Sequence, residues 1–488
     1  MNDSEQLLEQ GNLLFTSGRF AEAEACYRQA YELQSDRAET ANNLGVALVE
    51  QGRCEEGLSW YRCAIGINRQ YYEAHFNSGN VLRLLTRWDE ACGSYEEALK
   101  VQPNAVSALT NLALAHGWAG RVELAIKNYE RAITADPRSA AAHNGLGLMF
   151  QRFECLDEAE RCFDRAVELD PQLPYPHVNR AQLWLLRERL VEGFREFQWR
   201  WRLPDISVAA SMPAWNGEPV DGRRVLLWTE QGTGDSIMLV RFAQDVQSRG
   251  AYVLLHCPPG LHALFGTCPF IDRVCDGSEP DLDADFHCPL FDLPRILHTT
   301  MDLLSRNTPY LRSEDAHSRQ WSSRLASMPG FKIGVAWQGN RTYPEDCHRS
   351  IPLKFFAPVA AVEEVTLVSL QMGDGAQQTT DSDLPFPLVD WTDAMDQDGA
   401  FVDTAALLPQ LDLVITCDTA VGHLAGALGV PVWIALSTAC DWRWFTGRTD
   451  SPWYPTVRLY RQSRLDDWHE VFEEMARDVR QLVPNRTA

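Results

Sequence analysis

The stretch NSGNVLRLLTRWDEACGSYEEALKVQP, residues 77–103, contains the pattern that organises the first two hundred residues of the chain. In it the small residue Gly79 is followed twelve positions later by Ala91, the aromatic Tyr95 comes four positions after that, and Pro103 closes the stretch. The first small position recurs every 34 residues, at Gly11, Gly45, Gly79, Ala113, Gly147 and Ala181. A fixed period of this length predicts stacked helical hairpins, with small residues where the two helices of a hairpin approach closely.

Two further positions keep the same register. The second small residue is Ala23, Gly57, Ala91, Ala125, Ala159 or Gly193, and the aromatic is Tyr27, Tyr61, Tyr95, Tyr129, Phe163 or Phe197. The pattern resembles the tetratricopeptide repeat and covers residues 1–203 in about six units. Such hairpins stack into an α-superhelix with a continuous core and a concave groove that binds peptides.

Asparagines recur two residues before the first small position, at Asn43, Asn77, Asn111 and Asn179. The series resembles the asparagine ladder of the protein O-linked N-acetylglucosamine transferases, and that resemblance implies a groove for an acceptor peptide. An amide offers both a donor and an acceptor to an extended backbone. The alternative is that these side chains satisfy neighbouring helix ends, and both interpretations stay open.

The second half of the chain has a different pattern. Between residues 204 and 222 the helical period gives way to prolines and an Asn-Gly pair, which predicts a linker. Beyond it, short apolar segments alternate with amphipathic ones, and strands are predicted at residues 225–228, 252–256, 333–337, 365–370, 413–416 and 432–436. The fold class is therefore α plus α/β, with Rossmann-type domains of parallel sheet at residues 223–328 and 329–488, and a terminal helix from Asp466 to Leu482.

Candidate chemistry lies in the turns after the strands, because open parallel sheets bind ligands just beyond the carboxyl ends of their strands. The first turn is residues 230–236, whose glycines let a substrate approach the backbone. Its Asp235 is placed either to cap a helix expected to begin near Ile237 or to accept a proton from an acceptor hydroxyl.

The second turn follows residues 333–337 and carries Arg341, His348 and Arg349. Cations at a strand end would neutralise a diphosphate in an otherwise acidic protein. The alternative is a solvated loop with ordinary charges.

The third turn lies in a complete strand, helix, strand unit, residues 411–436. Asp418 and Thr419 open its helix, and Gly429 closes it. A helix start presents free amides and the positive end of a dipole to a phosphate, and His423 lies one turn further along the same face. Alternatively, Asp418 is a plain N-cap and His423 a packed core residue.

These residues resemble a known family. The motif Asp418-Thr419-x-x-x-His423-Leu424-Ala425-x-Ala427-Leu428-Gly429-x-Pro431, together with Gly234-Asp235 after the first strand, is similar to the heptosyltransferase-like glycosyltransferases (family nine) of the GT-B fold. The whole chain resembles bacterial fusions of a tetratricopeptide array to such a domain, among them the flagellin glycosyltransferases. Two positions depart from the pattern, since Ala420 stands where glycine is usual and Arg349 where lysine is expected.

The resemblance implies a GT-B-like pair of domains, the second of which binds a nucleotide-activated sugar, and a terminal helix that crosses back to the first. It implies that Asp235 is the catalytic base. The donor-binding residues that it implies are Gly234, Arg349, Asp403, Thr404, Asp418, Thr419 and His423. Thr419, His423 and Arg349 would hold the diphosphate. Asp403 and Thr404 would contact ribose or base, with a helix cap as the alternative.

Two other features of the sequence are candidates for ligand or metal binding. The segment Asp441-Trp442-Arg443-Trp444-Phe445 either stacks a base or sugar face or packs in the core. Asp281-Leu282-Asp283 and Asp396-Gln397-Asp398 have the spacing of a metal-binding D-x-D motif, but both lie in loop-like sequence. Neither a metal nor another cofactor is therefore expected.

Together these features predict a metal-independent, inverting glycosyltransferase. It would move a sugar from a nucleotide-sugar donor to a hydroxyl of a protein acceptor that the groove of the array recruits. A flagellin-like protein is one such acceptor. Two alternatives stay open. One is a non-catalytic adaptor with a degenerate GT-B domain, and the other is a glycosyltransferase that acts on a lipopolysaccharide-type glycan.

Charge and composition narrow the expected partners. The chain of 488 residues has 67 acidic and 44 basic side chains, a net charge of −23, which has the wrong sign for binding nucleic acid or an anionic membrane surface. We expect no membrane insertion and no export signal. Thirteen cysteines without a C-x-x-C pair fit a reducing compartment, so the sequence predicts a cytoplasmic protein.

Overall fold

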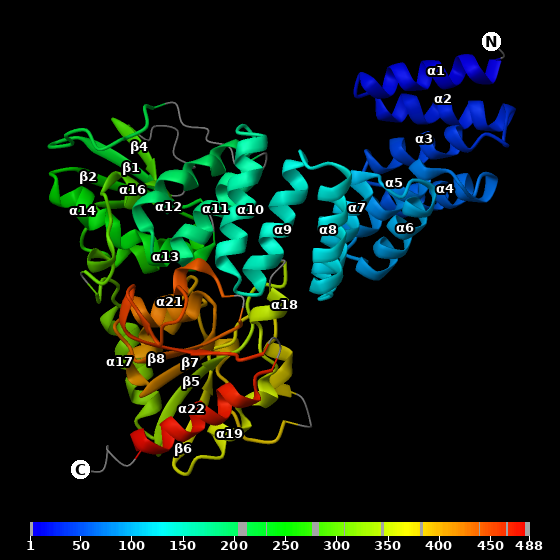
Figure 1. The fold of residues 1–488 in the computed structure, drawn as a ribbon. Helices are drawn as coiled ribbons and strands as arrows, with labels where there is room; N and C mark the ends of the chain where they lie inside the picture. The colour runs from blue at the N-terminus through cyan, green and yellow to red at the C-terminus, as the bar shows by residue number, and fades with distance from the viewer. Residues whose placement is uncertain are drawn as a thin grey trace. The chain divides into compact units, whose positions relative to one another are not determined.

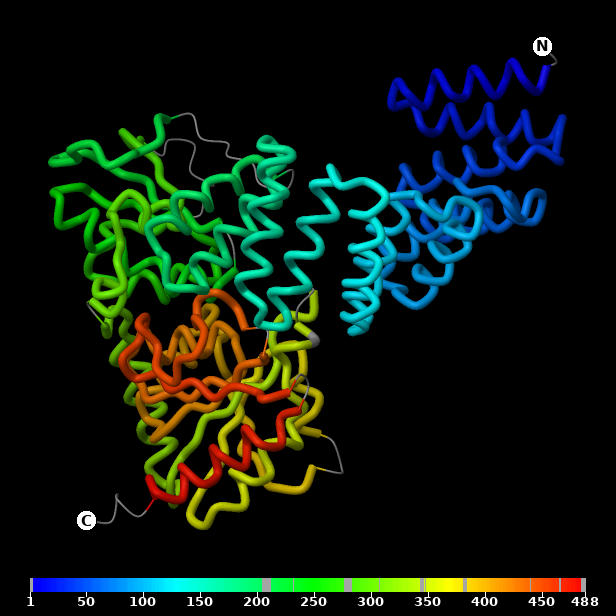
Figure 2. Tube along the Cα trace, viewed as in Figure 1, coloured from blue at the N-terminus to red at the C-terminus, as the bar shows by residue number. Residues whose placement is uncertain are grey.

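The computed structural model describes residues 3–203, 212–230, 232–275, 283–306, 308–342, 346–380, 384–438, 440–464 and 467–483. Residues 204–211 of the predicted linker, Asp281 and Leu282 of one D-x-D spacing, and Asp466 lie outside these ranges. The chain divides into two compact units, Met1–Asn179 and Arg180–Ala488. The first is an array of helices and the second contains two parallel sheets with their helices (Figures 1 and 2).

Helical hairpins follow one another along the first unit, as the 34-residue period predicts. The helices are α1 (Asp3–Thr16), α2 (Phe20–Leu33), α3 (Ala38–Val49), α4 (Cys54–Ile67), α5 (Tyr72–Leu84), α6 (Trp88–Val101), α7 (Val106–Trp118), α8 (Val122–Ala135), α9 (Ala140–Arg152), α10 (Leu156–Leu169), α11 (Pro174–Leu186) and α12 (Leu190–Glu196). In the hairpins from α1–α2 to α9–α10 the two helices pack against each other, and within this stretch each hairpin packs against the next. The prediction of a repeat array is confirmed.

The small and aromatic positions of the repeat meet inside each hairpin. A Cβ added to Gly79 on α5 would lie 2.5 Å from the ring of Tyr95 on α6. The same contact joins Gly11 to Tyr27 at 2.5 Å and Gly147 to Phe163 at 2.6 Å. The period therefore reflects a steric requirement, because the glycines Gly11, Gly79 and Gly147 leave the space that the aromatic ring of the same hairpin fills, and the other units keep a small residue at this position.

The division between units falls within α11, so the end of α11 and the whole of α12 belong to the second unit. The helix η1 (Phe197–Arg202) follows α12 and carries Arg200, which is buried. Its guanidinium donates to Glu230 at 2.9 Å and to Asp292 at 2.7 Å, both beyond strands of the first sheet. The compact boundary therefore lies before residue 203, because these buried ion pairs join η1 to the α/β part of the second unit.

The first sheet has the strands β1 (Arg224–Trp228), β2 (Tyr252–His256), β3 (Arg273–Cys275) and β4 (Phe286–Pro289). They are parallel, in the order β3-β2-β1-β4, and Val225 pairs with both Val253 and Phe286. Its helices are α13 (Thr233–Leu239), α14 (Ala243–Ser248), α15 (His262–Gly266) and α16 (Leu293–Ile296). The helix expected near Ile237 thus begins earlier, and Asp235 lies within its first turn.

The described end of the predicted linker is part of this domain. Ala214 forms a parallel bridge with His287, and the amide of Trp215 donates to the carbonyl of His287 at 2.8 Å. The indole of Trp215 is buried. Residues 212–222 therefore pack onto the edge of the sheet beside β4.

The second sheet has the strands β5 (Phe331–Ala336), β6 (Val365–Ser369), β7 (Leu413–Cys417), β8 (Val432–Leu436), β9 (Asp450–Ser451) and β10 (Tyr454–Arg461). Their order is β6-β5-β7-β8-β10-β9, and of these strands β9 alone is antiparallel. The helices are α17 (Asp315–Leu325), α18 (Asp346–Arg349), α19 (Ala357–Ala360), α20 (Val402–Leu407), α21 (Ala420–Ala427) and α22 (His469–Leu482). The predicted parallel α/β architecture is confirmed for both domains.

The terminal helix α22 covers its own sheet. It buries Val471, Phe472 and Met475 in the hydrophobic core that also contains Ile333 of β5 and Ile415 of β7. The expectation that this helix crosses back to the first domain is wrong in this structure, because its apolar face is satisfied against the second sheet.

Each sheet has one place where the strand order reverses. In the first sheet the chain moves outward from β1 to β3 and then returns to the other side of β1 as β4. In the second sheet it goes from β5 to β6 and returns beside β5 as β7. Ligands of open α/β sheets bind outside the carboxyl ends of the strands at such a point. The three candidate turns follow β1, β5 and β7. These are strands at which the order reverses, β1 in the first sheet and β5 and β7 in the second.

Candidate functional site

Asp235 lies beyond the carboxyl end of β1, in the first turn of α13. The N-cap of this helix is Gly232, which provides no side-chain cap. The Asp235 carboxylate forms an ion pair with Arg443 of η10 (Trp442–Trp444), and 16% of the Asp235 side chain and 11% of the Arg443 side chain are exposed. The capping interpretation is thus not supported, since the carboxylate faces a guanidinium from the second α/β domain.

Arg443 also binds Asp441. Its Nη1 donates to Asp441 Oδ1 at 2.5 Å, while Nη2 faces Asp235. Burial disfavours the charged guanidinium, but the carboxylates of Asp235 and Asp441 raise the pKa of Arg443 above its ordinary value. Burial raises the pKa of Asp235, and the positive charge of Arg443 opposes that rise. The site therefore keeps a charged arginine between two carboxylates away from bulk water.

The start of α21 lies beyond β7. Thr419 is the N-cap residue but makes no capping hydrogen bond through its side chain, and its hydroxyl lies 3.1 Å from the hydroxyl of Thr416. Burial, and then the charge of Asp441, raise the pKa of Asp418 to about 6, while Arg349 and Arg443 oppose the rise. The helix thus begins with amides that the side chain of its N-cap residue, Thr419, does not satisfy, next to a carboxyl group whose pKa is raised to about 6.

His423 is a packed residue one turn into α21. It is 3% exposed, its Nδ1 lies 3.0 Å from the Tyr454 hydroxyl, and its ring stacks on Trp444 with centroids 5.0 Å apart. Burial and the charge of Arg443 lower the pKa of His423 well below its ordinary range, so the imidazole is neutral. These contacts support the packed-core alternative, and its role at a diphosphate stays a prediction.

Gly234 lies against His423. A Cβ on Gly234 would be 2.8 Å from His423 Cδ2 and 3.6 Å from the Cα of Ala420, the first residue of α21. The helices α13 and α21 pack against each other (Figure 1). The glycine therefore permits the close approach that brings Asp235 to the start of α21.

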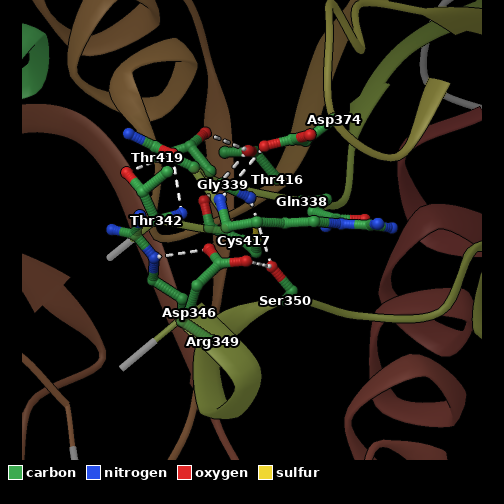
Figure 3. A network of polar contacts seen from close by, with 12 residues as sticks. Gln338, Gly339, Thr342, Asp346, Arg349, Ser350, Asp374, Thr416, Cys417 and Thr419 are labelled. Carbon is green, nitrogen blue, oxygen red and sulfur yellow. Dashed lines mark hydrogen bonds and ion pairs between the residues drawn. The ribbon is translucent and has the colours of Figure 1, made fainter. Parts of the chain in front are cut away.

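Arg349 ends the short helix α18 beside the turn after β5. Its Nε donates to Asp346 Oδ1 at 3.1 Å, and Asp346 Oδ2 accepts from Ser350 at 3.0 Å (Figure 3). The Ser350 hydroxyl in turn accepts from the amide of Gly339 at 3.2 Å. The solvated-loop alternative is wrong for Arg349, since 25% of its side chain is exposed and Asp346 holds it in place. Although burial disfavours its charge, Asp418 raises the pKa of Arg349.

Asp403 and Thr404 are buried at the start of α20. Asp403 accepts from Trp321 Nε1 at 2.8 Å and from the amide of Asp396 at 2.7 Å. Asp396 in turn accepts from the amides of Asp403 at 2.7 Å and Thr404 at 3.0 Å. The cap alternative is therefore wrong for these two residues, because Asp396 performs that role.

The four asparagines of the ladder line up along the array, and each donates to an asparagine of the preceding hairpin. The distances are 3.1 Å for Asn43 to Asn12, 3.0 Å for Asn77 to Asn42, 2.9 Å for Asn111 to Asn80 and 2.9 Å for Asn179 to Asn144. The helix-end alternative is thus wrong for these bonds, which join side chains of successive repeats. Each bond uses one donor of the amide, and peptide binding by the ladder stays a prediction.

The sequence offered the segment with Asp441 and Arg443 as one that either stacks a base or sugar face or packs in the core, but it did not indicate that Arg443 pairs with Asp235. The tryptophans on either side of Arg443 made the segment resemble core. A second feature marks it, because Phe445 has φ 53° and ψ −176°, a conformation that is strained for any residue with a side chain. The sequence signal available was a charged pair, Asp441 and Arg443, inside an aromatic run after β8.

Two observations concern metal binding and membrane insertion. In the ranges that the structure describes, no three His, Cys, Asp or Glu side chains are grouped so that they could hold a metal ion. No helix in those ranges combines the length and the apolar character that crossing a membrane requires.

Comparison with known proteins identifies the repeats. Family models described as tetratricopeptide repeat match residues 8–72, 72–105 and 111–174. The hairpins of the first unit are therefore tetratricopeptide repeats, in a chain whose second unit holds two parallel α/β sheets.

One curated relative extends beyond the array. The chain is 26% identical over 328 residues to Protein FlbA from Caulobacter vibrioides (strain ATCC 19089 / CIP 103742 / CB 15). The alignment covers 62% of this chain and 54% of FlbA, so the chain spans about half the length of that relative.

Solved structures match part of the chain. MamA from Desulfovibrio magneticus RS-1 is 19% identical, with 35% of this chain and 97% of that one covered and a TM-score of 0.33. A tetratricopeptide repeat protein from Parabacteroides merdae ATCC 43184 is 19% identical, with 40% and 78% covered and a TM-score of 0.37. Pseudomonas aeruginosa pilF is 16% identical, with 42% of this chain and 93% of that one covered and a TM-score of 0.37.

Proposed function

We propose that the chain is a metal-independent, inverting glycosyltransferase that moves a sugar from a nucleotide-sugar donor to a hydroxyl group of a protein acceptor. One observation carries the proposal: Asp235, beyond β1 of the first sheet, is paired with Arg443 and lies beside the start of α21 in the second domain. In such a reaction the hydroxyl attacks the anomeric carbon while the phosphate leaves. A base from one domain and a phosphate site from the other must therefore be neighbours.

The residues would divide the work as follows. Asp235 takes the proton of the acceptor hydroxyl as that oxygen attacks the anomeric carbon, and the bond from that carbon to the phosphate oxygen breaks. Negative charge develops on the departing phosphate, where the amides that begin α21, the Thr419 hydroxyl and Arg349 would stabilise it. A well-placed donor of this kind contributes about 3 kcal/mol by analogy with oxyanion sites.

The repeats supply the reason to expect a protein acceptor. Tetratricopeptide arrays present a concave surface to extended peptides, and four asparagines lie in line along this array. The resemblance to the flagellin glycosyltransferases makes a flagellin-like protein the first acceptor to try.

The test uses the purified full chain with a panel of nucleotide sugars, a flagellin and Asp235→Asn. We expect the wild type to transfer sugar, detected as a mass increase on the acceptor, and the variant to lose transfer while donor binding, followed by thermal shift, survives. Asp245→Asn is the matched control, because Asp245 is a half-buried carboxylate on the next helix, α14. Full transfer by Asp235→Asn would refute the proposed base.

A second candidate is the non-catalytic adaptor. One observation favours it: the charged groups of the site are already paired, and the two guanidiniums of Arg349 and Arg443 are surrounded by four carboxylates. An adaptor would bind the acceptor through the array, and no nucleotide sugar would raise its melting temperature. The same thermal-shift panel therefore separates the two functions.

A further inference from the structure

The segment that carries Arg443 is held rigidly. Arg461 of β10 donates through Nη2 to the carbonyls of Trp444 at 2.7 Å and Phe445 at 2.9 Å. Its Nη1 lies 2.9 Å from Cys440 Sγ. These bonds hold Phe445 in its strained conformation, and strain of this kind is retained where the surrounding structure imposes it. The backbone at Arg443 is therefore fixed, and a change of partner must come from the side chain.

The Arg443 side chain has separate nitrogens for its two carboxylates. Asp441 accepts a hydrogen bond from Arg443 Nη1. It also caps η10, since its Oδ1 accepts from the Arg443 amide at 3.0 Å. Asp235 takes Nη2. Among the described residues, no group accepts a hydrogen bond from the buried Nε–H. The guanidinium can thus keep its bond to Asp441 through Nη1 while the edge that faces Asp235, with Nε and Nη2, donates hydrogen bonds to a new anion.

The pairing has a chemical consequence for Asp235. A carboxylate next to a guanidinium is a poor proton acceptor, because the positive charge favours the ionised form. Burial raises the pKa of Asp235, and Arg443 holds that pKa below the value it would have without the pairing, so Asp235 is a weaker base while Arg443 holds it. A phosphate is the natural competitor, since the planar fork of arginine matches its oxygens and charge-assisted bonds of this type are strong.

We infer that Arg443 exchanges partners during the reaction: it is paired with Asp235 when the site holds no nucleotide, and it binds the donor's phosphate when the nucleotide sugar is present. Donor binding then releases Asp235 as the base. This inference rests on the proposed function and assigns to Arg443 a place in the donor site. It also assigns an order, in which the donor binds before the acceptor hydroxyl loses its proton, because Asp235 is a weaker base while Arg443 is paired with it than after the pairing breaks.

The first test measures nucleotide binding without any transfer reaction. The full chain is titrated with UDP, GDP, ADP and CMP, followed by thermal shift and calorimetry, for the wild type, Arg443→Gln, Arg443→Lys and Arg448→Gln. We expect at least a tenfold loss of affinity for Arg443→Gln and about a threefold loss for Arg443→Lys, which keeps the charge without the fork. Arg448→Gln is the matched control, since Arg448 pairs with Asp450 and Glu188 instead, and it should bind as the wild type does.

The second test follows Asp235 through the pH dependence of transfer. The acidic limb of kcat/KM reports the free enzyme and that of kcat the donor complex. Asp235 faces Arg443, Asp441 and Arg349, so loss of Arg443 to the phosphate and the arrival of the phosphate charge both raise its pKa. We expect the kcat limb of the wild type at higher pH than the kcat/KM limb, with the gap reduced in Arg443→Gln.

The outcomes separate this inference from the proposed function. If the wild type transfers sugar but Arg443→Gln binds nucleotide with unchanged affinity, the partner exchange is refuted and the glycosyltransferase stands. If Arg443→Gln loses nucleotide binding but no donor is ever turned over, Arg443 is a phosphate ligand and the enzyme assignment falls. Circular dichroism comes first, and if Arg443→Gln does not fold, unchanged affinity in Arg443→Lys overturns the inference.

Discussion

Gly234 of α13 and His423 of α21 touch with no room for a side chain between them. A Cβ on Gly234 would lie 2.8 Å from His423 Cδ2, well inside van der Waals contact. The imidazole has little freedom to move away, because Trp444 stacks on it and the Tyr454 hydroxyl binds its Nδ1. This contact sets the separation of the helices that carry Asp235 and the candidate phosphate site.

Replacing Gly234 by alanine should therefore push α13 away from α21. We expect a loss of about 1–3 kcal/mol in the free energy of unfolding, the usual cost of overpacking a filled interior, together with weaker transfer. Chemical denaturation followed by tryptophan fluorescence measures the first effect.

Gly232→Ala is the control, because a Cβ there would meet, within the part of the chain that the structure describes, only Asp235 Oδ2 at an ordinary 3.7 Å. Its effect on stability should stay within about 0.5 kcal/mol. Equal effects of the two substitutions would contradict the steric account.

The raised pKa of Asp418 predicts a pH dependence of stability. Burial and Asp441 raise this pKa from 3.8 to about 6, so the folded protein holds the proton more tightly than the unfolded chain does. The stabilisation is complete below about pH 4 and is lost as the pH rises through about 6. Asp418→Asn removes the ionisation, so the variant should gain on the wild type over this interval, by at most about 3 kcal/mol at pH 7.5.

Denaturation of both proteins at pH 4.5 and pH 7.5 measures this difference. Asp393→Asn, at an exposed carboxylate, is the control and should follow the wild type at both pH values. Parallel pH profiles for the wild type and Asp418→Asn would show that Asp418 does not titrate in this range.

The sequence could predict elements whose residues interact with near neighbours along the chain. The spacing of Gly79 and Tyr95 indicated the hairpin because the two residues meet within one repeat. The short apolar run at residues 413–416 indicated a strand, and in the structure β7 (Leu413–Cys417) is buried throughout. The three-residue β3 and the strand β10, which contains Pro455 and the exposed Arg458, did not stand out from loop sequence.

The site was harder to predict, because its contacts join distant parts of the chain. Asp235 and Arg443 are more than two hundred residues apart, and only folding brings a carboxylate after β1 to an arginine after β8. Asp396 caps α20 from outside the helix, so Asp403 and Thr404 looked like cap residues when they were the capped ones. Local patterns identify the strand ends, but they do not say which of them meet.

The asparagine ladder should contribute to both stability and acceptor binding. Asn77→Ala removes its hydrogen bond to Asn42, and we expect a loss of about 1 kcal/mol in the free energy of unfolding. With all four ladder asparagines replaced by alanine, modification of a protein acceptor should fall at least tenfold while hydrolysis of the donor continues.

Hydrogen exchange of the array and mass spectrometry of the acceptor separate these two effects. Asn104→Ala, at an exposed position between α6 and α7, should change neither of them. Unchanged acceptor modification in the fourfold variant, with the array still folded, would exclude the ladder from peptide binding.

The buried ion pairs of Arg200 should cost the protein most when they are broken. Arg200 binds Glu230 through two nitrogens and Asp292 through one of them, and its side chain is 1% exposed. Arg200→Gln leaves two carboxylates without their cation, so we expect a loss of about 3–5 kcal/mol near pH 7. The loss should be smaller at pH 4.5, because burial raises the pKa of Glu230 and its proton removes the unpaired charge.

Arg223→Gln is the matched control, since its ion pair with Asp285 is exposed and should contribute less than about 1 kcal/mol. Equal losses for the two variants in urea denaturation would show that the Arg200 cluster does not hold the end of the array to the first sheet.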